Sequence, residues 1–229
     1  MRAGVAPAAC NLTCGWFAVA QYFSIHPDNP QPRLIRQAAQ ILRGGGVIVY
    51  PTDSCYALGC HIGDKAAMER IRAIRGIDAR HHFALVCRDV GEAAVYARID
   101  DQQFKLLRAG AVGGFAFILH ATREVPRRLL HERRKTIGIR LPPHRVVQSL
   151  LAELGEPLLS SSLILPGDAQ PLTDTDEIRS RLEHVVDLVI DAGVCGVVPS
   201  TVVDLTGAMP LITREGVGRA DLLGAGIGP

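Results

Sequence analysis

The segment from Gly44 to Cys60 constrains the fold of this 229-residue chain more than any other. Three glycines at 44–46 end a predicted helix, 31–43, whose apolar residues recur at helical spacing. The run VIVY at 47–50 is apolar, as expected of a strand buried on both faces. Pro51 ends that strand, and hydroxyl and carboxylate side chains follow directly. This order predicts an α/β domain with polar groups gathered at one edge of its sheet.

Other segments extend the pattern along the chain. Apolar spacing predicts further helices at 64–76, 146–154 and 175–182, and one or two through residues 96 and 104–107. Short apolar runs predict strands at 83–87, 115–119, 137–141, 158–161, 185–190, 201–205 and 211–213. The strand-rich C-terminal part breaks the alternation of a doubly wound fold. We therefore expect one α/β domain with a mixed, twisted sheet.

Composition and local patterns suggest where this domain begins and where the chain resides. Residues 1–21 are predicted to be a dispensable extension, 22–218 the domain and 219–229 a tail. The apolar stretch near the N-terminus is short and interrupted by Pro7, unlike a signal peptide, and no run reaches the roughly 18 apolar residues that span a bilayer. The six cysteines form no C-x-x-C pair, which favours a reduced, cytoplasmic protein without structural zinc.

Basic residues are concentrated in one stretch although the formal net charge is only +2. Seven basic residues lie between 123 and 140, opposed by two acidic ones. No aromatic residue interleaves them, so double-stranded RNA or the acceptor end of a transfer RNA fits better than a stacked single strand. The alternative is a solvated loop that reflects the general excess of Arg over Lys. The predicted RNA-contacting residues are Arg127, Arg128, Arg133, Arg134 and Lys135.

The polar residues after the 47–50 strand are candidates for a ligand site. Thr52 and Ser54 can donate or accept hydrogen bonds, and Tyr56 adds a flat wall with a polar tip. The alternative is a Ser/Thr turn that only closes the strand, and residue chemistry leaves both interpretations open. The chain has no G-x-S-x-G elbow and no P-loop, so hydrolase and P-loop NTPase functions lack their key element.

The same segment, YPTDSCYALGC at 50–60, resembles the Y-P-T-[DE]-[ST]-x-Y-x-L-G-C signature of the YrdC/YciO family, the threonylcarbamoyl-adenylate synthase-like proteins. Three further matches follow in order: LSSS at 159–162, PSTVVDLTG at 199–207 and REG at 214–216. The resemblance covers about 22–218, and the run at 125–140 is most similar to the YciO branch.

The resemblance implies a YrdC-like domain whose helices surround a large concave cleft. The family's synthases join threonine, bicarbonate and ATP into threonylcarbamoyl-AMP, which serves transfer-RNA modification, and release pyrophosphate. The resemblance further implies that ATP with Mg²⁺ is a substrate complex, that no cofactor is tightly bound and that no protein side chains hold a metal. It also implies RNA as a partner and no association with a membrane. The implied substrate-binding residues are Thr52, Ser54, Tyr56 and His81. The implied nucleotide-binding residues are Arg75, Arg140, Ser160, Ser162, Ser200 and Arg214.

The chain departs from the synthase pattern at two places. The synthases carry K-x-R-P-x-x-[HK]-P-L where residues 75–83 read RGIDARHHF, so Ile77 stands at the second basic position. Their S-x-N becomes Ser162-Leu163-Ile164. One lost donor costs about 2.7–4 kcal/mol of transition-state stabilisation, so the departures leave a weaker reaction, a related reaction and binding alone as alternatives to full synthase activity. We expect a nucleotide- and RNA-binding protein with synthase-like architecture; a double-stranded RNA-binding protein without synthase activity and a scaffold of a modification complex stay open.

Overall fold

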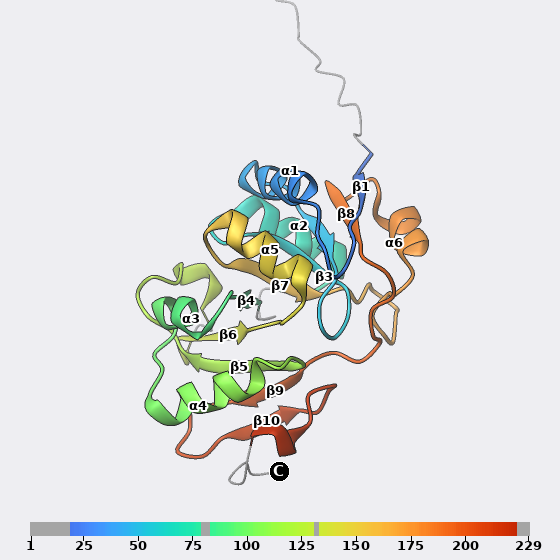
Figure 1. Ribbon diagram of the computed structural model, residues 1–229. Coiled ribbons are helices and arrows are strands. Elements are labelled where there is room, and N and C mark those ends of the chain that lie inside the picture. The colour runs from blue at the N-terminus through green and yellow to red at the C-terminus, as the bar shows by residue number, and fades with distance from the viewer. Residues whose placement is uncertain (1–18, 79–82, 131–132, 224–229) are drawn as a thin grey trace, which may run out of the picture.

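The computed structural model describes residues 19–78, 83–130 and 133–223 (Figure 1). Over these ranges, ten strands form one mixed sheet in the order β1-β8-β2-β3-β7-β4-β6-β5-β9-β10. Pairings β1–β8, β8–β2, β4–β6 and β5–β9 are parallel, and the others are antiparallel. The predicted α/β class with a mixed sheet is therefore confirmed.

The strands are β1 (Gln21–Ser24), β2 (Ile48–Tyr50), β3 (Ala57–His61), β4 (Ala84–Val86), β5 (Phe115–His120), β6 (Thr136–Arg140), β7 (Leu158–Ser162), β8 (Leu188–Asp191), β9 (Thr201–Asp204) and β10 (Leu211–Arg214). The helices are α1 (Pro32–Arg43), α2 (Lys65–Arg75), α3 (Val90–Tyr96), α4 (Asp101–Gly110), α5 (Arg145–Leu154) and α6 (Thr175–Leu182), with short 3₁₀ turns η1 (Arg127–Leu129) and η2 (Ala220–Leu223).

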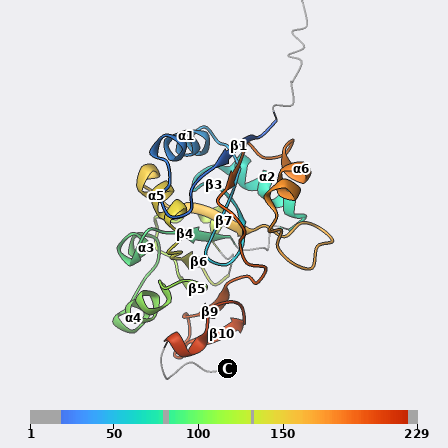
Figure 2. The same cartoon turned by 45° about the vertical axis from the view of Figure 1, so that its right-hand side comes forward.

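Helices cover both faces of the part of the sheet around β2. In the turned view of Figure 2, α1 and α5 lie on one side of these strands and α2 and α6 on the other. Alternation along β2 accounts for this, because Ile48 and Tyr50 pack with α1 and α5 while Val49 packs with α2 and α6. Within the described ranges, no helix is long and apolar enough to cross a membrane.

Two strands are missing from the sequence prediction, and one predicted strand begins three residues too early. β1 and β3 were not predicted; β3 continues directly from the polar turn and is buried between β2 and β7. The predicted strand at 185–190 begins only at Leu188, so that boundary was wrong. The reason is local: the N–H groups of Val185 and Val186 both donate to Leu182 O and continue the turn that ends α6.

The ends of α2 fix the position of its last residue, Arg75. At the start, the Asp64 side chain accepts a hydrogen bond from Ala67 N. At the end, Gly76 adopts φ +60°, and the N–H groups of Gly76 and Ile77 donate to Ala73 O and Arg72 O. This is a Schellman motif, in which an apolar residue normally follows the glycine and packs inward. Here Ile77 follows Gly76 and packs against the hydrophobic core that contains the buried side chains of α2.

Candidate functional site

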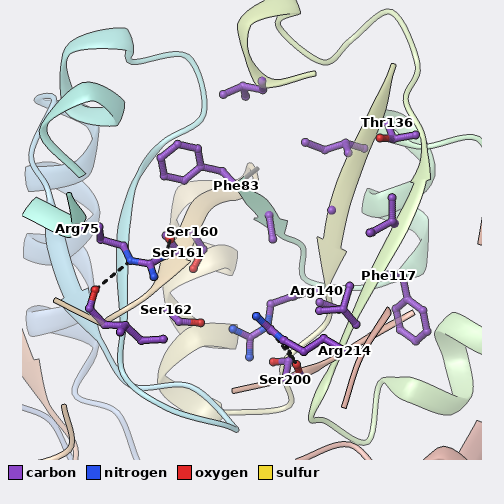
Figure 3. Close-up of a pocket in the computed structure, with 18 of the residues that line it drawn as sticks. Arg75, Phe83, Phe117, Thr136, Arg140, Ser160, Ser161, Ser162, Ser200 and Arg214 are labelled. Carbon is purple, nitrogen blue, oxygen red and sulfur yellow. Dashed lines mark hydrogen bonds between the residues drawn. The ribbon is translucent and has the colours of Figure 1, made fainter. Parts of the chain in front are cut away.

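A pocket of about 370 Å³ opens over the middle of the sheet (Figure 3). Its floor contains small residues at paired register positions, with Ala84 of β4 between Ser160 of β7 and Gly138 of β6. Apolar side chains, among them Phe83 and Ile137, also line the pocket. All six residues that the sequence proposed for nucleotide contacts line this pocket: Arg75, Arg140, Ser160, Ser162, Ser200 and Arg214.

Two arginines border the pocket: Arg75 of α2 is half-buried, and Arg214 of β10 is more exposed. Arg75 donates to Ser161 Oγ at 2.5 Å and to Ile164 O at 3.2 Å. Arg214 donates to Ser200 O through Nη2 at 2.8 Å and through Nε at 3.3 Å. Burial lowers the pKa of both guanidinium groups from the ordinary value of 12.5, and the charge of Arg214 further lowers the pKa of Arg75. Guanidinium groups remain charged at neutral pH, so these two side chains bring positive charge to the pocket.

A third arginine, Arg140 at the end of β6, is only 5% exposed. Its Nη2 atom lies 2.9 Å from Asp53 Oδ1, 3.0 Å from Ser54 Oγ and 3.4 Å from Thr52 Oγ1. Among the described residues, its buried Nε atom has no hydrogen-bond partner. Its side-chain hydrogen bonds to the described residues all use Nη2, so these residues leave Nη1, on a residue that lines the pocket, without a protein partner.

The hydroxyl groups of Ser160 and Ser200, which line the pocket, form hydrogen bonds with residues outside its lining. Ser160 Oγ accepts a 2.6 Å hydrogen bond from the hydroxyl of Tyr50. Burial raises the pKa of Tyr50 to about 12, so this tyrosine stays a donor at physiological pH. Ser200 Oγ donates to Ser54 Oγ at 3.3 Å and thereby joins the contacts around Arg140.

The proposed substrate-binding residues lie outside the pocket lining. Thr52 Oγ1 donates to Cys55 O at 2.6 Å and accepts from the N–H groups of Ser54 and Cys55, which is the turn-closing geometry. Tyr56 is fully buried and its hydroxyl donates to Gly193 O at 2.7 Å. Thr52 and Ser54 therefore contact pocket-lining residues from behind, Thr52 through Arg140 and Ser54 through Arg140 and Ser200, and Tyr56 bonds the backbone of Gly193 instead. His81 lies outside the described residues.

The basic run meets the same pocket at Arg134. Arg134 lines the pocket with a side chain that is 64% exposed and lies 3.5 Å from Asp204 Oδ2. Arg127 and Arg128 lie in η1, where Arg128 donates to Gly63 O. Arg133 and Lys135 are exposed as well. A polyanion bound along this run would therefore lie beside the pocket.

Two residues that hold the pocket donors were not among the predicted site residues. Asp53 was visible as the carboxylate in the polar motif, and a carboxylate directly after a buried strand is a signal that sequence reasoning can use. Tyr50 was predicted only as part of the buried strand. Of the two departures from the synthase pattern, Ile164 lines the pocket, whereas Ile77 packs at the end of α2 and is not among the lining residues described.

The comparisons with known proteins agree with the motifs. Residues 40–216 match the model of the Sua5/YciO/YrdC family, which is described as "Telomere recombination". The chain belongs to this family. It is 55% identical to Escherichia coli YciO, a protein described as uncharacterized, over 87% of this chain and 97% of YciO. The crystal structure of YciO matches with a TM-score of 0.86 and covers 89% of this chain and 99% of YciO.

More distant members of the family carry a named activity or ligand. A threonylcarbamoyl-AMP synthase of Nitrosococcus oceani is 32% identical over 68% of this chain and 84% of that protein. The structure of P. abyssi Sua5 complexed with L-threonine matches with a TM-score of 0.78 at 25% identity, over 85% of this chain and 57% of Sua5. These matches confirm the family and the YrdC fold that the sequence motifs indicated.

Proposed function

We propose that this chain binds ATP with Mg²⁺ in the pocket bordered by Arg75, Arg140 and Arg214, and slowly converts ATP, threonine and bicarbonate into threonylcarbamoyl-AMP and pyrophosphate. One observation carries the proposal: three arginines line one pocket, and the most buried of them, Arg140, makes its side-chain hydrogen bonds to the described residues through Nη2 alone, which leaves Nη1 for a ligand. A group of this kind suits an anion with several oxygens, such as a triphosphate.

The rest of the pocket supports a nucleotide rather than a simple anion. The serine hydroxyls supply further donors, and the apolar lining residues, together with the small residues paired across β7, β4 and β6, suit a planar base. The volume of about 370 Å³ lies in the range of small-molecule sites. The named activity of the Nitrosococcus synthase adds support from a relative that shares the family.

The proposed chemistry needs positioning and charge neutralisation. The threonine amine and bicarbonate form a carbamate with loss of water. A carbamate oxygen then attacks the α-phosphorus of ATP, and the bond from that phosphorus to the bridging oxygen breaks to release pyrophosphate. The arginines would neutralise charge on the α-phosphate and on the leaving group, and Mg²⁺ arrives with ATP as part of the substrate. Ile164 offers no polar side-chain group to the pocket, which supports slow turnover.

A coupled pyrophosphate-release assay tests the activity. At high protein concentration, release is expected only when ATP, threonine and bicarbonate are all present, and omission of any one abolishes it. Release that ignores threonine would instead indicate an ATP pyrophosphohydrolase. No release at all, with ATP still bound, would reduce the function to nucleotide binding.

The exposed basic run supports a second function, binding of RNA beside the pocket. Its side chains are solvent-accessible, and Arg134 belongs to both surfaces. Double-stranded RNA or a transfer-RNA acceptor end would place its phosphates along this run. If the protein binds RNA but neither binds nor turns over ATP, the alternative of an RNA-binding protein without synthase activity is favoured.

A further inference from the structure

The carboxylate of Asp53 lies behind the pocket and is not part of its lining. Its side chain is only 9% exposed, and each oxygen has its own partner in the protein. Oδ1 accepts from Arg140 Nη2 at 2.9 Å, and Oδ2 accepts from the backbone N–H of Gly114. Asp53 therefore faces the protein on both sides and is placed to act through Arg140 rather than on a ligand.

The loop between α4 and β5 is shaped around this carboxylate. Gly113 and Gly114 adopt φ values of +112° and +82°, which L-residues with side chains rarely adopt. A Cβ atom at Gly113 would lie 3.1 Å from Asp53 Oδ2 and 3.2 Å from the ring of Pro143. Gly114 O also accepts from Thr201 N, which ties the loop to β9. The chain thus holds Asp53 firmly in one place.

The contacts of Arg140 are one-sided. Every side-chain hydrogen bond that Arg140 makes to the described residues leaves from Nη2, while Nε is buried and unpaired. A guanidinium is planar and rigid, so fixing Nη2 against Asp53 also fixes the direction of the remaining donors. Arg140 lies at the polar end of the pocket close to Arg214 (Figure 3).

We propose that Asp53 is a positioning residue: it holds Arg140 so that the remaining guanidinium donors serve the phosphate groups of the nucleotide, and it raises nucleotide affinity without touching the ligand. This inference rests on the proposed nucleotide binding. The positioning role and simple charge neutralisation predict opposite effects of removing Asp53 on nucleotide affinity. If Asp53 only neutralised positive charge, its removal would strengthen the binding of an anion; if it positions Arg140, its removal weakens that binding.

The test is calorimetric titration of ATP with Mg²⁺ into wild type and Asp53→Asn. An asparagine can supply one acceptor but not two, so it loses either the Arg140 or the Gly114 contact. The Kd of D53N is expected to rise roughly tenfold, the effect typical of a lost charge-assisted hydrogen bond. Asp204→Asn is the matched control, because it removes a carboxylate beside the same pocket from the exposed Arg134; its Kd is expected to stay unchanged or to fall.

A double-mutant cycle separates positioning from general destabilisation. If Asp53 acts through Arg140, D53N has no further effect on the Kd in an Arg140→Ala background. Should D53N fail to fold, Arg140→Lys serves instead, because lysine keeps the charge and loses the planar fork, and its Kd must rise. Wild-type or tighter binding by D53N, additive effects in the cycle, or unchanged binding by R140K would each overturn the inference. If the wild-type protein does not bind ATP, the proposed function itself fails. If the wild type binds ATP but the variants behave otherwise than predicted, only the positioning role of Asp53 fails.

Discussion

Tyr50 donates a 2.6 Å hydrogen bond to Ser160 Oγ, from a buried strand to the floor of the pocket. Because Tyr50 uses its proton in this bond, the Ser160 hydroxyl is left free to donate its own proton to a ligand. Tyr50, which does not line the pocket, thus determines that Ser160 acts as a hydrogen-bond donor inside it. Ser160 lies on β7 two strands away from β2, with β3 between them.

Replacing Tyr50 with Phe removes only this hydroxyl. The Ser160 hydroxyl then loses its fixed role as a donor, and we expect ATP affinity to fall about fivefold, equivalent to about 1 kcal/mol. Tyr22→Phe is the matched control, since the Tyr22 hydroxyl also bonds a side chain, Asp191, at 2.9 Å in a strand distant from the pocket. Equal Kd values for Y50F and wild type by calorimetry would contradict this role.

The two departures from the synthase pattern are predicted to have unequal effects. Ile164→Asn restores an amide inside the pocket and should raise the rate of pyrophosphate release about tenfold or more, because one such donor contributes about 2.7–4 kcal/mol in other enzymes. Ile77→Arg replaces the apolar residue of the Schellman motif and should mainly lower stability, by about 1 kcal/mol in thermal or urea unfolding. Ile212→Asn, outside the pocket, is the control. A gain of activity from I77R alone would show that the Ile164 position is not what limits turnover.

Binding of RNA to the basic run is predicted to be salt-dependent. Changing Arg127, Arg128, Arg133 and Arg134 to Ala should reduce the slope of log K against log salt for duplex RNA by about 3, since each lost phosphate contact contributes about 0.9 on double-stranded DNA and about 0.7 on single strands. The measurement is a filter-binding or anisotropy titration at several salt concentrations. The control changes Arg33 and Arg36 on the exposed side of α1. An unchanged slope in the fourfold variant would exclude this run as the RNA surface.

Stability should decrease at mildly acidic pH because of His144. Its imidazole is half-buried, and Nδ1 has no hydrogen-bond partner among the described residues. Burial lowers its pKa from the ordinary 6.5, although Asp53 and Asp28 oppose the shift. Between the two pKa values, His144 is therefore protonated in the unfolded chain but neutral in the folded protein. The free energy of unfolding consequently falls as pH drops below 6.5 and levels off below the folded-state pKa.

The comparison that checks this is the melting temperature of wild type and His144→Gln at pH 7.5 and 5.5. Wild type should lose more stability between the two pH values than H144Q, because glutamine does not titrate. Equal losses would show that other groups, such as the paired carboxylates, account for the acid sensitivity.

The sequence predicted the fold class and most elements because their signals are local. The glycines after α1, the cap at Asp64 and the apolar runs of the central strands each depend on neighbouring residues. β3 was missed because ALGCH contains small residues and gains its stability from pairing with both β2 and β7. That pairing is a long-range property which no short window contains.

The candidate site was predictable to a similar degree. All six residues that the resemblance named for nucleotide contacts line the pocket, because a family resemblance carries information about distant positions, but Thr136 and Ser161 line it as well and were not named. The supporting contacts of Tyr50 and Asp53 depend on which side chains meet across strands, and Tyr56 turned out to bond Gly193 O instead of facing the pocket. Such contacts follow from register and loop geometry rather than from residue type.

The measurement that tests the central claim most directly is the affinity of ATP with Mg²⁺ for wild type and Arg214→Ala, by calorimetry. Arg219→Ala is the control, because Arg219 is exposed and pairs only with nearby Asp221 among the described residues. We expect saturable binding by wild type and R219A, and a Kd at least tenfold higher for R214A, as a lost charged donor implies. Absence of ATP binding by wild type, or equal Kd values for R214A and wild type, would contradict the account.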